Sequence, residues 1–293
     1  MNTLVHYIKS LQGPGMVYFS SKKWAEIIAE RIRSENIARV AYYHGGLESE
    51  DRLQIQAQFL NDQLDVICCT NAFGMGINKK DIRYIIHFHY PVQMESYLQE
   101  IGRAGRDRKS SIAIVLHSYD DQYLPLSLID SEFPDFDQLD HTIKLLVELE
   151  QKQNLLSKQH EQLIVEETGI TESMWRLIRY HLEQAYALSG ERLALSGIEE
   201  KFRQKMITFI SDRKAKKVAK LQEVETWLET KSCRRDAYLH LFDEEKTVPI
   251  ENCCDICGIN EHQYFATNQN SSYETFLLSD WKLELKMLLH QKD

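Results

Sequence analysis

Residues 65–88 read DVICCTNAFGMGINKKDIRYIIHF, two short apolar runs separated by a polar loop that contains two glycines. The runs DVICCT (65–70) and YIIHF (84–88) have continuous apolar interiors. This pattern is typical of strands that are covered on both faces in a parallel sheet. The stretch therefore predicts two buried strands joined by a polar loop.

The same alternation of apolar strands and single helices extends over residues 1–122. Further strands are expected at 16–20, 38–44 and 111–117, with helices at 22–35, 48–61 and 93–102. Right-handed crossovers then give an α/β fold, a doubly wound parallel sheet. Ligands of such sheets bind beyond the carboxyl ends of the strands. We therefore expect a site at this edge, formed by the polar loops 44–47, 70–81 and 99–108.

Composition limits the class of protein. The chain has 293 residues, enough for two or three domains, and no apolar run approaches the ~18–20 residues that a membrane span needs. The first ten residues lack the apolar core of a signal peptide, and cysteines without a secretory signal indicate reduced thiols. We therefore expect a cytoplasmic protein with no membrane contact.

Charge is unevenly distributed along the chain. Residues 201–235 contain eleven Lys or Arg against four Asp or Glu, a local balance of +7, which leaves −16 for the rest of a chain whose net charge is −9. A polyanion would therefore bind a local patch. The basic helix expected at 200–229 is the main candidate for contact with a nucleic-acid backbone, through Lys214, Lys216 and Lys217. A solvated helix face is the alternative.

Residues 123–199 form a mostly helical region. A long amphipathic helix is expected at 138–163, followed by helix, tight turn and helix over 166–188. Gly169 suits a left-handed turn position and Thr171 an N-cap, which gives a winged-helix-like segment. Plain core packing of two helices is the alternative. Residues 279–293 predict a short amphipathic helix that docks on the body.

Three arginines and a glutamine surround two glycines in QEIGRAGRDR, residues 99–108. A guanidinium is always charged and pairs bidentately with phosphate oxygens. The chain nevertheless has no G-x-x-x-x-G-K-[ST] loop to hold a nucleotide and no acidic magnesium motif after a strand. The pattern therefore indicates arginines that act on a nucleotide held by another domain, as an arginine finger does.

Four cysteines lie within 25 residues near the end of the chain: Cys233, Cys253, Cys254 and Cys257. A C-x-x-C pair and a count of four thiols predict a closed, structural Zn²⁺ site. Because neighbouring side chains on an extended backbone diverge, His240 or water could replace Cys253 as a ligand. Cys68 and Cys69 lie inside a strand, where we expect them to be packing residues.

Two groups of motifs carry a resemblance to a known family. QEIGRAGRD resembles motif VI of superfamily-two helicases, and TNAFGMGINKKDIRYIIHFHYP is similar to motif V of the RecQ branch. CRRDAYLHLFDEE followed by CCDIC resembles the RecQ zinc-binding subdomain. The resemblance implies the C-terminal portion of a RecQ-type ATP-dependent DNA helicase. Its parts would be a RecA-like motor domain (1–122), the helical region (123–199), a basic helix with the zinc-binding subdomain (200–262) and a tail (263–293).

The resemblance also implies roles for individual residues. Arg106 matches the finger on the γ-phosphate, supported by Arg103 and Gln99. The loops that couple nucleotide and DNA would contain Gly74, Gly76, Asn78, Gly102 and Gly105. DNA contacts would come from Thr70, Asn71, Arg234 and Arg235, besides the three lysines of the basic helix. His89 occupies a position that is often acidic in relatives, so no specific role is expected for it.

The implied function is half of an ATP-driven DNA-unwinding enzyme that acts on single-stranded DNA or a single-strand/duplex junction. ATP and Mg²⁺ would bind only together with the N-terminal RecA-like domain of the same parent protein, so the chain alone is predicted not to hydrolyse ATP. The alternative is a non-catalytic, zinc-containing DNA-binding or adaptor protein that keeps the helicase fold. The intact arginine motif favours the enzyme, and the cysteine cluster disfavours an RNA helicase.

Overall fold

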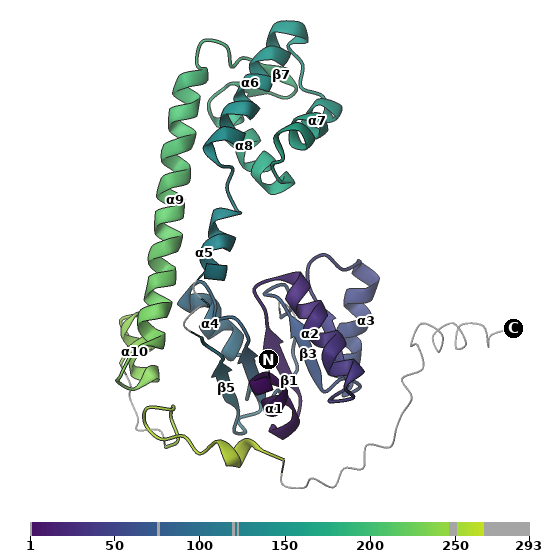
Figure 1. Cartoon of the computed structure of the whole chain (residues 1–293), viewed down its shortest axis with the longest axis vertical. Coiled ribbons are helices and arrows are strands. Elements are labelled where there is room, and N and C mark those ends of the chain that lie inside the picture. Colours follow the sequence, from purple (N-terminus) through teal and green to yellow (C-terminus); the bar gives the residue numbers. More distant parts are fainter. Residues whose placement is uncertain (1, 75–76, 119–120, 122, 246–250, 267–293) are drawn as a thin grey trace, which may run out of the picture.

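The computed structural model describes residues 2–74, 77–118, 121, 123–245 and 251–266; Gly76 and the tail helix expected at 279–293 lie outside them. Five strands form one sheet in the order β2-β3-β1-β4-β5, and every neighbouring pair is parallel (Figure 1). They are β1 Gly15–Tyr18, β2 Val40–Tyr43, β3 Val66–Cys69, β4 Tyr84–His87 and β5 Ile112–Val115. The predicted doubly wound α/β domain is thus confirmed.

Alternate strand residues enter two separate cores, one on each face of the sheet. On the first face, α1 (Asn2–Ser10) and α2 (Lys22–Ser34) pack over Val17, Cys68 and Ile86. On the second face, α3 (Ser49–Leu60) packs with Met16 and Ile67. Because side chains of a strand alternate in direction, four-residue strands are enough to fill both cores.

The remaining part of the second face is covered by the chain between β3 and β4, residues 70–83, which we call the crossover loop. Its described residues contain no helix. Phe73, Ile77 and Ile82 of this loop are buried in the same core as Met16 and Ile85. The crossover loop therefore does the covering that a helix does in the other connections.

The arginine stretch packs onto the crossover loop. The N–H of Gly105 donates to the carbonyl of Ile82 (3.0 Å) and that of Asp107 to the carbonyl of Lys80 (3.1 Å). These acceptors lead into the amino end of β4, whereas loops 44–47 and 70–73 follow the carboxyl ends of β2 and β3. The expectation that all three loops gather at the carboxyl edge is therefore wrong for residues 105–107, because the helix-free crossover carries the chain back across the sheet face.

The helical region forms a separate core. It contains α6 (Phe136–Gln153), α7 (Lys158–Thr168), α8 (Glu172–Gln184) and the short hairpin β6 (Leu188–Ser189) and β7 (Arg192–Leu193). Helix α5 (Tyr123–Asp130) lies outside this core, because its Ile129 packs with Met94, Leu221 and Trp227 instead. Gly169 is left-handed (φ 67°) and Thr171 caps α8, so the predicted helix–turn–helix is confirmed. The single helix expected at 138–163 is wrong. It breaks at Asn154 (φ 52°), after which Ser157 caps a new helix.

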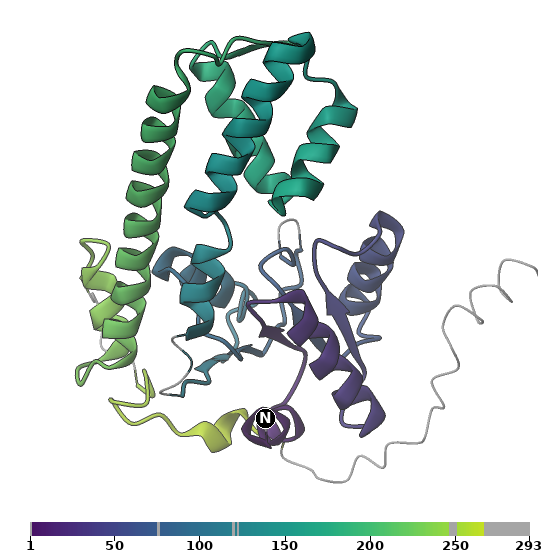
Figure 2. The same ribbon diagram turned by 45° about the horizontal axis from the view of Figure 1, so that its top comes forward.

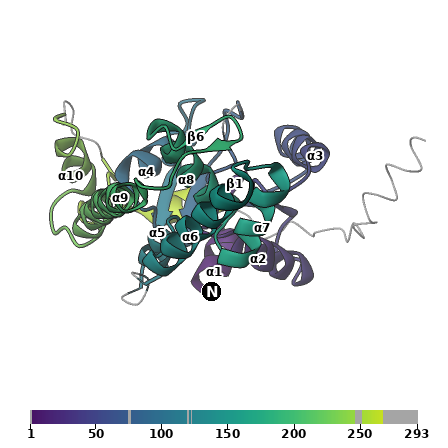
Figure 3. The ribbon, with the colours of Figure 1, turned by 90° about the horizontal axis from the view of Figure 1, so that it is seen from above.

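Helix α9 (Glu199–Leu228) links this region to the sheet domain along one side of the molecule (Figures 1 and 2). Its first half contributes Phe202, Met206 and Ile210 to the helical core. Its second half packs Leu221, Val224 and Trp227 against the end of the sheet domain that contains α4 (Met94–Ile101). Figure 3, viewed almost along α9, shows α4 and α10 (Arg234–His240) on either side of it.

The chain returns from the cysteine-containing segment to the first helix. The N–H of Ala266 donates to the carbonyl of Ser10 (2.9 Å), and that of Gln12 to the carbonyl of Tyr264 (2.9 Å). The hydroxyl of Tyr7 donates to Glu261 (3.1 Å). Residues 261–266 are therefore packed as part of the sheet domain, beside α1 (Figure 1).

The crossover loop gives a first test. A methyl group at Gly74 (φ 133°) would lie 2.2 Å from Cζ of Arg103. We expect Gly74→Ala to lower the free energy of unfolding by more than ~2 kcal/mol, from backbone strain and displacement of the guanidinium. Gly45→Ala is the matched control, because its methyl group would meet only Ala72, at 3.8 Å. Urea denaturation of both variants measures the difference, and equal losses would contradict the packing described here.

Candidate functional site

The guanidinium of Arg103 is buried on the second sheet face, against the crossover loop. The side chain is 8% exposed, and its Nη1 donates to the carbonyl of Gly74 at 2.5 Å. Glycine at this position lets the guanidinium lie directly against the backbone. Arg103 therefore joins two segments that are 29 residues apart in the sequence.

Three further side chains complete this buried polar cluster. Nε2 of His87 lies 2.7 Å from Oε2 of Glu100, and the His87 ring stacks on Tyr18 with centroids 5.3 Å apart. Burial raises the pKa of Tyr18 well above its ordinary value. The sequence interpretation did not assign these residues to the site. A signal existed, since helical spacing from Met94 and Tyr97 places Glu100 on the buried face of α4.

Arg106 is held much more loosely than Arg103. Its side chain is exposed, and its two hydrogen bonds go to the carbonyls of Gly102 and Ile77, both at 3.3 Å. Within the described part of the chain it forms no ion pair. Gln99 is exposed on α4, and Gly105 is left-handed (φ 65°) beside Ser111. The structure thus brings Arg103 and Arg106 together, and of these two only Arg106 is exposed.

The carboxyl edge of the sheet gathers a second group of polar residues. Thr70 and Asn71 follow β3, and Gly45 of the neighbouring loop lies next to Ala72. The N–H of Gly46 donates to Nδ1 of His44 (3.2 Å), so Nε2 of His44 carries the hydrogen that bonds Glu26 (2.7 Å). Asn71 is exposed. This edge offers the small polar side chains of Thr70 and Asn71, which suit phosphate oxygens.

His89 follows the carboxyl end of β4. The N–H of Ser20 donates to its Nδ1 at 3.3 Å, and its ring contacts Trp24 and Phe88. Burial lowers the pKa of His89. The residue therefore has a packing role at this edge. Asn78, in the crossover loop, is exposed.

The basic helix α9 carries two different sets of cations. Lys214 pairs with Asp130 (3.1 Å), Lys217 with Glu132 (2.7 Å) and Lys220 with Glu95. Lys216 is exposed and forms no ion pair with any described residue, and neither does Arg213, which lies over the ring of Phe209. Two of the three lysines predicted to contact DNA are thus already engaged with carboxylates of the same chain.

The four cysteine sulfur atoms converge. The Sγ atoms of Cys233, Cys253, Cys254 and Cys257 all lie within 4.8 Å of one another. A tetrahedral Zn²⁺ with bonds of ~2.3 Å separates its sulfurs by about 3.8 Å, so the group fits this ion. The turn at Asn252 (φ 52°) bends the chain ahead of Cys253 and Cys254. His240 is not part of the group; its ring faces Asp236 instead.

Arg234 holds this segment on α9. Its guanidinium makes a bidentate pair with Asp255 (2.5 and 2.8 Å) and donates to the carbonyls of Trp227 and Leu228. The pair also keeps the pKa of Asp255 below its ordinary value. The DNA contact predicted for Arg234 is therefore not supported by its geometry, because four of its five donors are used within the chain. Arg235 is partly exposed.

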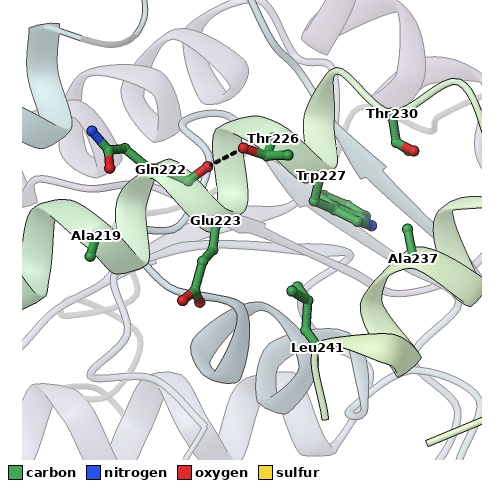
Figure 4. Close-up of a pocket in the computed structure, with 8 residues that line it drawn as sticks. All are labelled: Ala219, Gln222, Glu223, Thr226, Trp227, Thr230, Ala237 and Leu241. Atoms are coloured by element: carbon green, nitrogen blue, oxygen red, sulfur yellow. Dashed lines mark hydrogen bonds between the residues drawn. The ribbon is translucent and has the colours of Figure 1, made fainter. Parts of the chain in front are cut away.

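An open groove of about 350 Å³ runs between α9 and α10, next to this segment (Figure 4). Trp227 of α9 and Ala237 and Leu241 of α10 form its apolar wall, and Glu223 is the only charged residue that lines it. A carboxylate without a neighbouring cation does not attract phosphate. The groove is thus unsuited to the DNA backbone.

Two family models match this chain, one over the sheet domain and one over α9 and the cysteine group. Residues 1–108 match the family model described as helicase conserved C-terminal domain, and residues 199–258 match that described as RecQ zinc-binding. The probable ATP-dependent DNA helicase RecS of Bacillus subtilis is 36% identical over 287 residues, 97% of this chain and 54% of that protein. The chain belongs to the RecQ helicase family. The ATP-dependent DNA helicase RecQ of the same bacterium is 46% identical over 116 residues, 40% of this chain and 20% of that protein.

The chain spans about half the length of the RecS relative. Among solved structures, a DEAD box protein from Methanococcus jannaschii aligns with 24% identity and a TM-score of 0.38, over 42% of this chain and 33% of that one. The match to the helicase C-terminal domain ends at the arginine stretch. The match to the RecQ zinc-binding family includes all four cysteines, whose sulfur atoms converge, and this supports a structural zinc ion. Along the part of the chain that the structure describes, no helix is long and apolar enough to cross a membrane.

The cysteine group gives the second test. Zinc content measured by elemental analysis should be close to one ion per chain. It should fall strongly in both Cys253→Ser and Cys254→Ser, because each removes one of four converging thiolates. His240→Ala is the control and should keep its zinc, since this ring faces Asp236. If Cys253→Ser keeps its zinc and His240→Ala loses it, His240 and not Cys253 is the fourth ligand.

Proposed function

We propose that this chain is the part of an ATP-dependent DNA helicase that supplies an arginine finger and a DNA-contacting surface. ATP and Mg²⁺ would be held by an N-terminal RecA-like domain of the same parent protein, because this sequence has no phosphate-binding loop. The DNA would be single-stranded or a single-strand/duplex junction. The chain alone would not hydrolyse ATP.

The contrast between Arg103 and Arg106 carries this proposal. Both belong to the motif that resembles motif VI, yet Arg103 is buried and Arg106 is exposed. A finger must present N–H donors to an oxyanion that arrives from another domain, and it must be placed before the anion comes. Arg106 has such donors on a loop that Gly105 and Asp107 bond to the crossover.

The DNA surface would join the carboxyl edge of the sheet to the exposed side of α9. Thr70 and Asn71 lie at that edge, and Arg213 and Lys216 of α9 are exposed and form no ion pair with any described residue. The zinc ion would be structural, because four thiolates close its coordination sphere. It would hold the described residues 233–245 and 251–257 together at the base of α9.

In the complete enzyme, Arg106→Ala should lower the single-turnover rate of ATP hydrolysis by about 10³-fold or more, since a finger stabilises mainly the transition state. Nucleotide affinity should change little. Arg108→Ala is the matched control on the same exposed loop and should keep nearly full turnover. Loss of nucleotide binding with an unchanged rate for the bound nucleotide would contradict the finger assignment.

Two double variants of α9 test the DNA surface with equal changes in charge. Arg213→Gln with Lys216→Gln should reduce the slope of log affinity against log salt by roughly 1.4–1.8, the loss of two phosphate contacts. Lys214→Gln with Lys217→Gln should change the slope much less, because those lysines already bind Asp130 and Glu132. Fluorescence anisotropy across a salt series compares them, and equal slopes would remove α9 from the DNA path.

A further inference from the structure

The buried polar cluster contains an unusual balance of charge. Glu100 is 7% exposed and is the only buried carboxylate among the described residues, while Arg103 is 8% exposed. A guanidinium keeps its charge at any ordinary pH, so a buried one needs a nearby negative group. Glu100 lies three residues before Arg103, at the end of α4. Its carboxylate pairs with His87 and forms no ion pair with Arg103 among the described residues, but the charges of Glu100 and Arg103 both act on the hydroxyl of Tyr18.

Glu100 and Arg103 fix opposite sides of one turn. Glu100 is tied to His87, the last residue of β4, at 2.7 Å. Arg103 is tied to Gly74 of the crossover loop at 2.5 Å. Between them α4 ends at Ile101, and the N–H of Arg103 donates back to the carbonyl of Glu100 (3.2 Å). The turn is thereby anchored to the sheet on one side and to the crossover on the other.

Arg106 depends on this turn for its placement. It follows Arg103 by three residues, and its own hydrogen bonds, both 3.3 Å long, are too weak to fix a long side chain. One of them goes to Gly102, which lies inside the anchored turn. We infer that Glu100, together with His87, is a positioning residue for Arg106. This inference rests on the proposed role of Arg106 as a finger.

The test uses Glu100→Gln, which keeps the size of the side chain and removes its charge. Glu95→Gln is the matched control, the same substitution on the same helix at an exposed residue paired with Lys220. The first readout is made on this chain alone, by NMR. The Nε–H of Arg103 is buried and has no hydrogen-bond partner among the described residues, so its solvent exchange reports opening of the turn. This exchange should become at least about tenfold faster in Glu100→Gln, since the buried charge that anchors the turn to His87 is lost, and should stay unchanged in Glu95→Gln.

The second readout is made in the complete enzyme. Glu100→Gln should lower kcat by on the order of 10²-fold with little change in KM for ATP, because a small displacement of a catalytic group has a cost of that size. Glu100→Asp keeps the charge and should retain more of both the exchange protection and kcat. If Glu100→Gln does not fold, Glu100→Asp against Glu95→Asp provides the comparison.

Three results would overturn the inference. Glu100→Gln could behave like Glu95→Gln in both readouts. It could speed exchange at Arg103 and leave kcat unchanged below the melting temperature, or it could lower kcat and leave exchange at Arg103 unaffected. The second is what a purely structural role gives. The proposed function fails separately, if Arg106→Ala itself leaves turnover intact. The exchange measurement needs no nucleotide, so it still reports on the cluster in that case.

Discussion

The buried contact between the guanidinium of Arg103 and the carbonyl of Gly74 is the constraint on which the rest of the site depends. The connection between β3 and β4 has no helix in its described residues, so its own backbone must be held against the sheet. An arginine offers several donors in a fixed plane and never loses its charge. Placed over a glycine, it bonds a carbonyl of the crossover and ties the arginine loop to that segment.

One short motif therefore contains two arginines with opposite physical roles. Arg103 gives up its hydration to organise the loop, and Glu100 places a buried negative charge on the same turn. Arg106, three residues later, stays exposed with long hydrogen bonds. An exposed guanidinium on a loop that is held in place keeps its donors available, and such preorganised donors are what stabilises an oxyanion.

The sequence predicted the parallel sheet, because apolar strands and single helices alternate over residues 1–122, and it predicted the α7–α8 turn, because Gly169 and Thr171 are local signals. It failed at 138–163, where apolar periodicity continues through a break set by Asn154 and Ser157. It also misplaced residues 105–107. The loop 70–81 was predicted correctly, but a loop assignment does not reveal that its later residues run to the amino end of β4, where they bond Gly105 and Asp107. The convergence of Cys253 with Cys254 depends on a bend at Asn252, which a residue count does not contain.

Counting charges along the sequence overestimates the cationic surface of α9. The balance of +7 over residues 201–235 adds every cation in the window, but the carboxylates that neutralise Lys214, Lys217 and Lys220 come from residues 95–132. Those pairs run along the side of α9 that faces α4 and α5, so they join the helix to its neighbours. Only the cations directed away from that side add to the field that a polyanion meets. One basic helix thus connects the helical core to the sheet, and the cationic surface that it leaves for a polyanion is narrower than its composition indicates.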